Sequence, residues 1–404
     1  MTGIDKQGAT FVAGLDGNKP SLTTAFLAFC LASCFCLSVC FFLAGCSQSG
    51  SPTSSTVTPP TPSAVCPTTL PAVVINAGYC TNTLNSTFTP STVDMNTTLA
   101  TGFQWYNKRF AGLGGGIATV ALQPNGSVIV GNDGSGSDLA TAAPLGASWV
   151  GTAYGGGAYF EATLSFNPAQ VVSADLAKSR WPAWWANPLE ADVPFYNLWY
   201  WTPTNSQYLH NAETDFFEYD LYASDRTNNP DPSGRTWGGT IHDWTHIADP
   251  TSSWGYSVPT GGRVQEANNS DQVPVGTDFT QPHRYGFLWI PATQTTCNNT
   301  VQWNADGSLN LTSGNGVGIF FFDGVPFKTS SQYAWCKYDS ATDTPAAMLA
   351  SGLANNWTFG VLDRQHLVPT FGSGGAALMT VYSVVVWQKD ATGNVTNGQT
   401  VTSN

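Results

Sequence analysis

Short β-forming runs separated by turn residues are the feature that most constrains the fold of this chain. From about Thr87 to Gln388, runs rich in β-branched and aromatic residues alternate with Gly, Pro, Asn and Asp. Clear examples span residues 127–130, 158–166, 286–290, 318–322 and 379–387. Strands of this length and spacing predict one all-β domain, either a two-sheet sandwich or a jelly roll. The only helix candidate is short, at 346–353.

The composition narrows the class of protein further. Only 10% of the 404 residues are charged, whereas 13% are aromatic, which is typical of a secreted β-protein. The net charge of −12 and the lack of a basic stripe argue against nucleic-acid binding. We expect a monomer without a cofactor or metal, although the sequence leaves a structural calcium ion open.

The N-terminal region predicts export. An apolar run from Ala25 to Gly45 ends at Cys46, and the sequence L-A-G-C at this point is similar to the processing site of bacterial lipoproteins. This similarity implies cleavage before Cys46 and attachment of lipid to its sulfur. The alternative is an uncleaved membrane anchor of about 20 residues. Either way we expect a protein tethered to a bacterial outer membrane or cell surface, whose only membrane contact is this anchor.

These observations divide the chain into four parts. We expect a lipoprotein signal peptide at 1–45, a Ser/Thr/Pro-rich linker at 46–84, the β domain at 85–392 and a C-terminal tail at 393–404. Four cysteines follow the start of the linker, an even number in an oxidising compartment. Three connectivities are open, and the pairs Cys66–Cys80 and Cys297–Cys336 keep each loop local.

An acidic stretch at 212–219, A-E-T-D-F-F-E-Y, carries the strongest functional signal. Glu213 and Asp215 share one face of a flat strand, while Glu218 points the other way. A β-bulge at Phe216-Phe217 would return Glu218 to the acidic face. A helix would not gather the three acids on one stripe. We therefore predict a bulged strand.

Three carboxyl groups this close favour hydrolysis of glycosidic bonds. Mutual repulsion raises at least one pKa, so that an ionised carboxylate and a protonated acid coexist at neutral pH. A retaining glycosidase needs this pair, with Glu213 as nucleophile, Glu218 as acid/base and Asp215 orienting the nucleophile. The alternative is a solvated edge strand whose acids deter aggregation, and the motif alone does not separate the two.

A second informative stretch, R-W-P-A-W-W-A-N, spans 180–187. On a strand, Trp181 and Trp185 share a face, where two indoles would form a stacking platform for sugar rings, and Trp184 points into the core. The alternative places all three indoles in the core, which is the commoner fate of tryptophan. Pro182 restricts this segment to a strand start or a bulge.

Together these residues resemble glycoside hydrolase family 16, in particular the laminarinase-like members with the bulged E-x-D-x-x-E strand. Further motifs that are similar to those of the family occur in the expected order at 155–164, 181–185, 239–242, 278–291, 319–324 and 386–388. The resemblance implies a concanavalin A-like jelly roll with a concave substrate cleft. It also implies the roles given above for Glu213, Asp215 and Glu218, sugar subsites at Trp181 and Trp185, and His242 beside the acids. Thr214 departs from the Ile, Leu or Val that is usual in the family.

The expected function is that of a retaining endo-glycosidase acting on a β-linked polysaccharide, most plausibly a β-1,3-glucan. Two alternatives stay open: a lectin-like protein that binds polysaccharide without cleaving it, and a hydrolase of another polysaccharide such as agarose or carrageenan. A polysaccharide lyase is disfavoured because the chain has only 14 Lys and Arg with which to bind a uronate.

Overall fold

The computed structural model describes residues 66–107, 119–131, 137–146, 148–168, 182–192, 212–219, 238–243, 247–248, 256–257, 273–274, 276–297, 300–328, 332–337, 339, 358–373 and 379–400. The chain divides into the units Met1–Pro60 and Thr61–Asn404, and every described element belongs to the second unit. The helix candidate at 346–353, the signal peptide and Cys46 lie outside the described residues. Within those ranges, the structure contains no helix long and apolar enough to span a bilayer.

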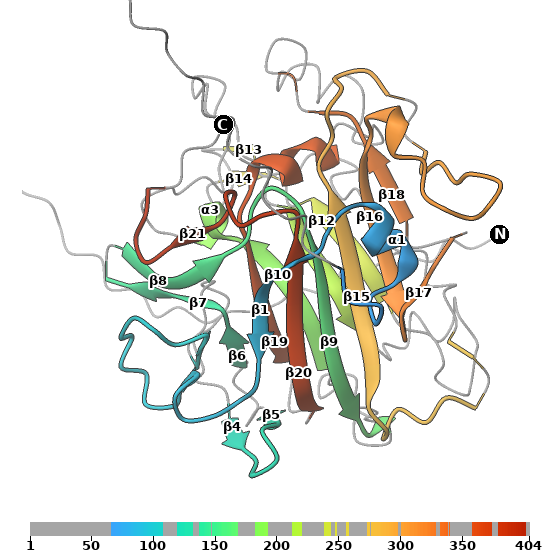
Figure 1. Cartoon of the computed structure of the whole chain (residues 1–404). Coiled ribbons are helices and arrows are strands. Elements are labelled where there is room, and N and C mark those ends of the chain that lie inside the picture. The colour runs from blue at the N-terminus through green and yellow to red at the C-terminus, as the bar shows by residue number, and fades with distance from the viewer. Residues whose placement is uncertain are drawn as a thin grey trace, which may run out of the picture. The chain divides into compact units, whose positions relative to one another are not determined.

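The first layer is a nine-stranded sheet (Figure 1). Its strands run in the order β17-β16-β15-β9-β20-β5-β4, with β1 beside β20 and β18 beside β16. All of its pairings are antiparallel. The strands are β1 (Thr81–Ser86), β4 (Thr119–Leu122), β5 (Val128–Gly131), β9 (Ala158–Phe166), β15 (His283–Ile290), β16 (Gly316–Phe322), β17 (Val325–Pro326), β18 (Gln332–Trp335) and β20 (Met379–Gln388).

The second layer is a seven-stranded sheet with the order β12-β11-β10-β19-β6-β3-β2. Its pairings are antiparallel except for the short β2–β3 pair at one edge. The strands are β2 (Val93–Asp94), β3 (Trp105–Tyr106), β6 (Ser137–Ala140), β10 (Pro182–Pro188), β11 (Ala212–Glu218), β12 (Gly238–Asp243) and β19 (Leu367–Ser373).

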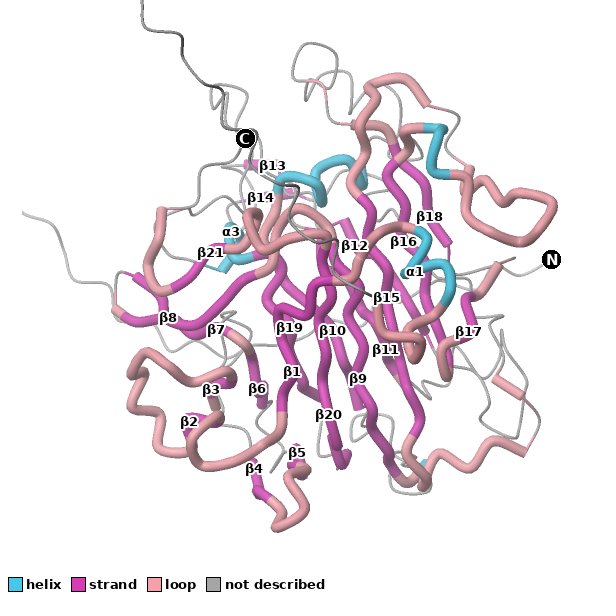
Figure 2. Tube along the Cα trace, in the orientation of Figure 1, coloured by secondary structure: helices cyan, strands magenta, loops and turns pink. Residues whose placement is uncertain are grey.

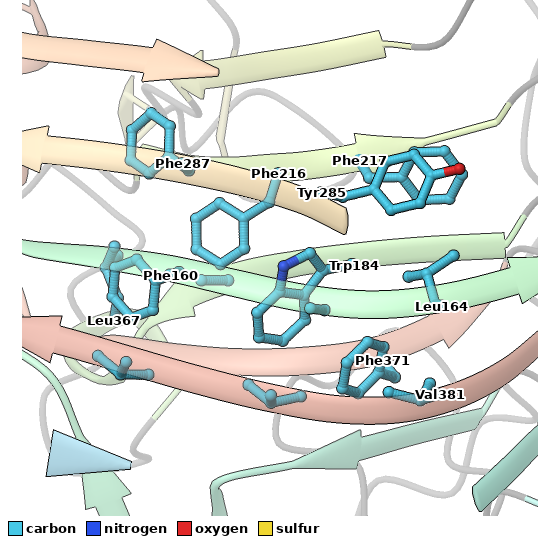
Figure 3. Packing of buried hydrophobic residues seen from close by; sticks show 14 of the residues in the cluster. Phe160, Leu164, Trp184, Phe216, Phe217, Tyr285, Phe287, Leu367, Phe371 and Val381 are labelled. Atoms are coloured by element: carbon cyan, nitrogen blue, oxygen red, sulfur yellow. The ribbon is translucent and has the colours of Figure 1, made fainter. Parts of the chain in front are cut away.

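An aromatic core lies between the two sheets. Phe160 of β9 stacks on Phe216 of β11 with ring centroids 4.9 Å apart, and Trp184 of β10 stacks on Phe371 of β19 at 4.4 Å. Figure 3 shows these side chains, contributed by strands of both sheets, in one packed layer. Alternate residues of β9 enter this core, as expected for a strand with one face in the sandwich. The predicted all-β jelly-roll sandwich is confirmed.

A second apolar cluster covers the outer face of the nine-stranded sheet. Helix α1 (Ala72–Asn76) and Tyr79 pack there against residues of β9, β15 and β16, and α1 lies in front of these strands in Figure 2. The disulfide Cys66–Cys80 closes this segment, and Cys297–Cys336 closes a second loop, so the predicted pairing is confirmed. The folded part therefore begins well before residue 85, because residues assigned to the linker bury apolar side chains.

Smaller elements complete the fold. A three-stranded sheet is formed by β7 (Ala142–Leu145), β8 (Ser148–Ala153) and β21 (Val395–Thr396), so residues expected in the tail also belong to the folded unit. Its apolar residues pack on β6 and β19 of the seven-stranded sheet. The remaining elements are α3 (Leu189–Asp192), β13 (Ile247–Ala248), β14 (Tyr256–Ser257) and the 3-10 helices η2 (Leu311–Ser313) and η3 (Thr358–Arg364).

Candidate active site

The acidic stretch forms strand β11 and contains the predicted bulge. On the β12 side, Asp215 pairs with Thr240 and Glu218 pairs with Gly238, so three steps along β11 face two along β12. The register toward β10 also shifts, because Trp184 pairs with Phe217 and Trp185 with Asp215. One extra residue is thus absorbed at Phe216-Phe217.

Burial along β11 shows which way each side chain points. Phe216, Phe217 and Tyr219 are fully buried in the core between the sheets, whereas Glu213 and Glu218 are partly exposed. Two consecutive phenylalanines face inward because the bulge interrupts the alternation of the strand. The three acids therefore lie on the face of the sheet that points away from the core, hereafter the acidic face.

Asp215 is the centre of the acid cluster. Only 1% of its surface is exposed, and its carboxyl group interacts with those of both Glu213 and Glu218. Burial raises the pKa of Asp215 well above its ordinary value, and the neighbouring charge of Glu213 raises it further.

The strands on either side of β11 supply the surroundings of the acids. Trp185 of β10 is the Cα partner of Asp215, and Ala183 is the partner of Glu218. His242 of β12 is the Cα partner of Glu213. Trp181 lies outside the described residues.

The tryptophans of β10 divide between the two faces as the alternation predicts. Trp184 is fully buried in the aromatic core, whereas Trp185 is on the acidic face. Trp185 is 9% exposed, and its role as a stacking surface stays a prediction. Thr214 is also fully buried, and its hydroxyl has no hydrogen-bond partner among the described residues, which shows that a polar residue occupies a core position here.

The end of β10 and the start of β19 are joined by two buried contacts between Glu190 and His366. The sequence did not reveal these contacts. The Glu190 carboxylate of α3 contacts His366 Nδ1 at 2.6 Å and accepts a hydrogen bond from the His366 backbone N–H at 3.0 Å. A side chain at Gly155 would collide with the His366 ring, so glycine is required at this approach. Because Glu190 and His366 lie far apart in sequence and outside any motif, only the fold brings them together.

The other candidate side chains have structural partners. His283 Nδ1 contacts the Asp323 carboxylate at 2.8 Å. Within the described ranges, no group of three or more His, Cys, Asp or Glu residues is arranged to hold a metal ion. The two disulfides are typical of proteins that mature in an oxidising compartment.

The fold and the site define a class: an all-β sandwich that carries three clustered carboxyl groups on one sheet face. No protein-family model matches the sequence, and no curated protein is detectably similar. Solved structures show only distant similarity. SCLam, a non-specific endo-beta-1,3(4)-glucanase from family GH16, is 13% identical, with 67% of this chain and 77% of that chain covered and a TM-score of 0.27.

Two further structures are equally distant. The globular domain of T. cruzi calreticulin is 9% identical, with 76% of this chain and 88% of that chain covered and a TM-score of 0.32. A fructofuranosidase from Schwanniomyces occidentalis is 7% identical, with 70% and 38% covered and a TM-score of 0.21. Similarities at these levels assign no function, so the functional conclusion rests on the site itself.

Proposed function

We propose that this protein is a retaining endo-glycosidase that hydrolyses a β-linked polysaccharide, with a β-1,3-glucan as the first substrate to test. The observation that carries the proposal is the gathering of Glu213, Asp215 and Glu218 on one sheet face by the bulge in β11. An edge strand whose acids only deter aggregation would leave them solvated, whereas Asp215 is almost completely buried. The sequence resemblance described above supports the same assignment.

The proposed reaction has two displacements. Glu218 donates its proton to the glycosidic oxygen while the Glu213 carboxylate attacks the anomeric carbon and forms a covalent glycosyl-enzyme. Glu218, now ionised, then removes a proton from water, which attacks the same carbon and releases Glu213. Burial and the neighbouring charge of Glu213 raise the pKa of Asp215, and its contact with Glu213 would orient the nucleophile.

A polysaccharide screen with matched variants tests this proposal. The exported protein is assayed against laminarin, lichenan, agarose, carrageenan and xylan, with release of reducing ends as the readout. Glu213→Gln is expected to lower kcat by at least about a thousandfold without loss of folding, because it removes the nucleophile but not the shape. Glu161→Gln is the control, since this buried carboxyl on β9 bonds to Tyr159 and takes no part in the cluster.

The stereochemistry of the first product provides the second readout. Proton NMR of the reaction should show the β-anomer first, since a double displacement retains the configuration. Inversion, or full activity in Glu213→Gln, would contradict the assigned roles. Binding of wild type to an insoluble glucan without release of reducing ends would instead establish a lectin-like protein.

We also propose that Cys46 carries a lipid that tethers the exported protein to a membrane. The support is the sequence alone, since Cys46 lies outside the described residues. Cys46→Ser in the full-length chain should abolish incorporation of labelled fatty acid and release the protein from the membrane fraction. Unchanged labelling in that variant would exclude Cys46 as the attachment site.

A further inference from the structure

We propose that Asn187 binds the sugar ring that Glu213 attacks, with its side-chain oxygen accepting a hydrogen bond from a hydroxyl group of that ring. This inference rests on the proposed glycosidase function and adds a substrate-positioning residue to it. Asn187 is the last residue of the stretch at 180–187, but the sequence gave it no role in catalysis or stacking. The assignment comes from its register, its burial and its unpartnered amide.

The register of the sheet places Asn187 beside Glu213. The last recorded pair between β10 and β11 joins Ala186 to Thr214. One further step in this antiparallel register brings Asn187 opposite Glu213. Side chains directly opposite each other on one sheet face have Cβ atoms about 5 Å apart. Asn187 therefore lies one strand away from the proposed nucleophile.

The alternation of β10 places the Asn187 side chain on the acidic face. Trp184 and Ala186 belong to the core between the sheets, whereas Trp185 lies beside Asp215 on the opposite face. Asn187 has the same parity as Trp185, so its amide points to the side that carries the three acids.

Burial without a partner marks this amide as a binding group. Asn187 is only 5% exposed, and its Oδ1 atom has no hydrogen-bond partner among the described residues. A buried polar atom without a partner costs about 1–3 kcal/mol, so such groups are rare unless a function retains them. A substrate hydroxyl would supply the missing donor.

The other neighbours of Asn187 explain its burial and do not satisfy it. On the side away from β11, its Cα partner is Val368 of β19. Val368 and Leu189 belong to the apolar cluster under the three-stranded sheet, together with Trp149. Asn187 thus sits between an apolar wall and the nucleophile, a position from which an amide can contact a sugar held over the acids.

The chemistry of the reaction gives this contact a kinetic signature. In retaining glycosidases, hydrogen bonds to hydroxyl groups near the anomeric carbon strengthen as the transition state forms. Loss of such a bond lowers kcat more than it raises KM. A residue that only supports the fold would lower thermal stability and activity together.

The experiment uses Asn187→Leu, which keeps the approximate size and removes the hydrogen-bonding amide. We expect kcat/KM to fall by about tenfold to a hundredfold, mainly through kcat, with a Tm equal to or above that of wild type, because an unpartnered buried oxygen has been removed. Asn107→Leu is the matched control. Asn107 is also 5% exposed with an unpartnered Oδ1, but it follows β3, three strands away from β10. Its kinetics should not change.

A second variant, Asn187→Asp, tests the position of Asn187 beside Glu213 if the leucine variant does not fold. It keeps an acceptor oxygen but places a negative charge beside Glu213, which raises the pKa of the nucleophile. The acidic limb of the kcat/KM pH profile should therefore move to higher pH. Kinetics of Asn187→Leu within twofold of wild type, or an unshifted pH profile of Asn187→Asp, would overturn the inference.

The inference and the proposed function fail in different ways. If wild type cleaves a polysaccharide and Glu213→Gln does not, the function stands and the Asn187 variants alone decide the inference. If neither wild type nor any variant cleaves a polysaccharide in the screen, the proposed function fails and the inference fails with it. Oligosaccharide affinity of Glu213→Gln, with and without Asn187→Leu, gives an independent readout, and a lower affinity in the double variant is expected.

Discussion

Deletion of Phe217 is expected to keep the acidic face and to destabilise the fold. Because of the bulge, the five steps from Glu213 to Glu218 along β11 lie opposite only four steps along β12. Without Phe217 the strand reads E-T-D-F-E-Y, in which plain alternation places all three acids on one face and Tyr219 in the core. The bulge is therefore a way to bury one more ring without losing the position of Glu218.

The magnitude follows from the contacts of Phe217. Its fully buried ring lies 4.2 Å from that of Tyr285 and 5.5 Å from that of Phe166. Loss of a buried phenylalanine side chain costs about 3–5 kcal/mol. For a domain of this size, that corresponds to a decrease in Tm on the order of 10 °C. Phe217→Ala is the matched control, since it loses the same ring and keeps the bulge.

The assay combines urea unfolding with kinetics on the best substrate of the screen. Both variants should unfold at lower urea, and both should keep activity within about tenfold of wild type, because the acids remain on one face. Insertion of an alanine after Phe217 should instead abolish activity, because it turns the Glu218 side chain into the core. A folded Phe217 deletion variant without activity would refute the reasoning that alternation alone positions the acids.

The remaining predictions concern stability. Asp363 accepts hydrogen bonds from the Trp289 and Trp335 indoles, and burial raises its pKa from 3.8 to about 7. Between about pH 4 and pH 7, the folded state therefore keeps a proton on Asp363 that the unfolded state releases. The free energy of unfolding should fall by up to about 4 kcal/mol as the pH rises through this range. In Asp363→Asn, the urea midpoint should no longer show this pH dependence. Cys297 and Cys336 are 39 residues apart, and Cys66 and Cys80 are 14 apart. By the loop-entropy relation, removal of the first bond should lower the free energy of unfolding by about 4 kcal/mol, and removal of the second by about 3 kcal/mol. Denaturation of the two double Cys→Ser variants measures both losses. A smaller cost for the longer loop would contradict this entropic account.

The bulged strand could be predicted from the sequence because the positions of its acidic residues and of its apolar residues both indicate it. Phe216 and Phe217 are apolar neighbours between acids, and only a bulge buries both rings while Glu213 and Glu218 point outward. The opposite directions of Trp184 and Trp185 follow from strand alternation in the same way. Local patterning therefore specified the acidic strand and its neighbour.

Other features depend on contacts that sequence patterns do not encode. The segment at 66–84 contains the short apolar run A-V-V-I at 72–75, and Val74 and Tyr79 are fully buried against the outer face of the nine-stranded sheet. Helix α1 is too short to show a helical period, so no pattern distinguished it from the linker. The 9% exposure of Trp185 and the burial of Asn187 follow from no local pattern of the strand.

The disulfide-closed segment at the start of the fold has a mechanical consequence. A pull on the chain ahead of Cys66 passes through the Cys66–Cys80 bond to β1 without extending the residues between the two cysteines. Strand β1 is hydrogen-bonded to β20, and β20 to β9, so the load spreads within the nine-stranded sheet. Strand β11 belongs to the other layer. A molecule held by its N-terminal end would bear tension on one layer while the carboxyl groups on the other keep their arrangement.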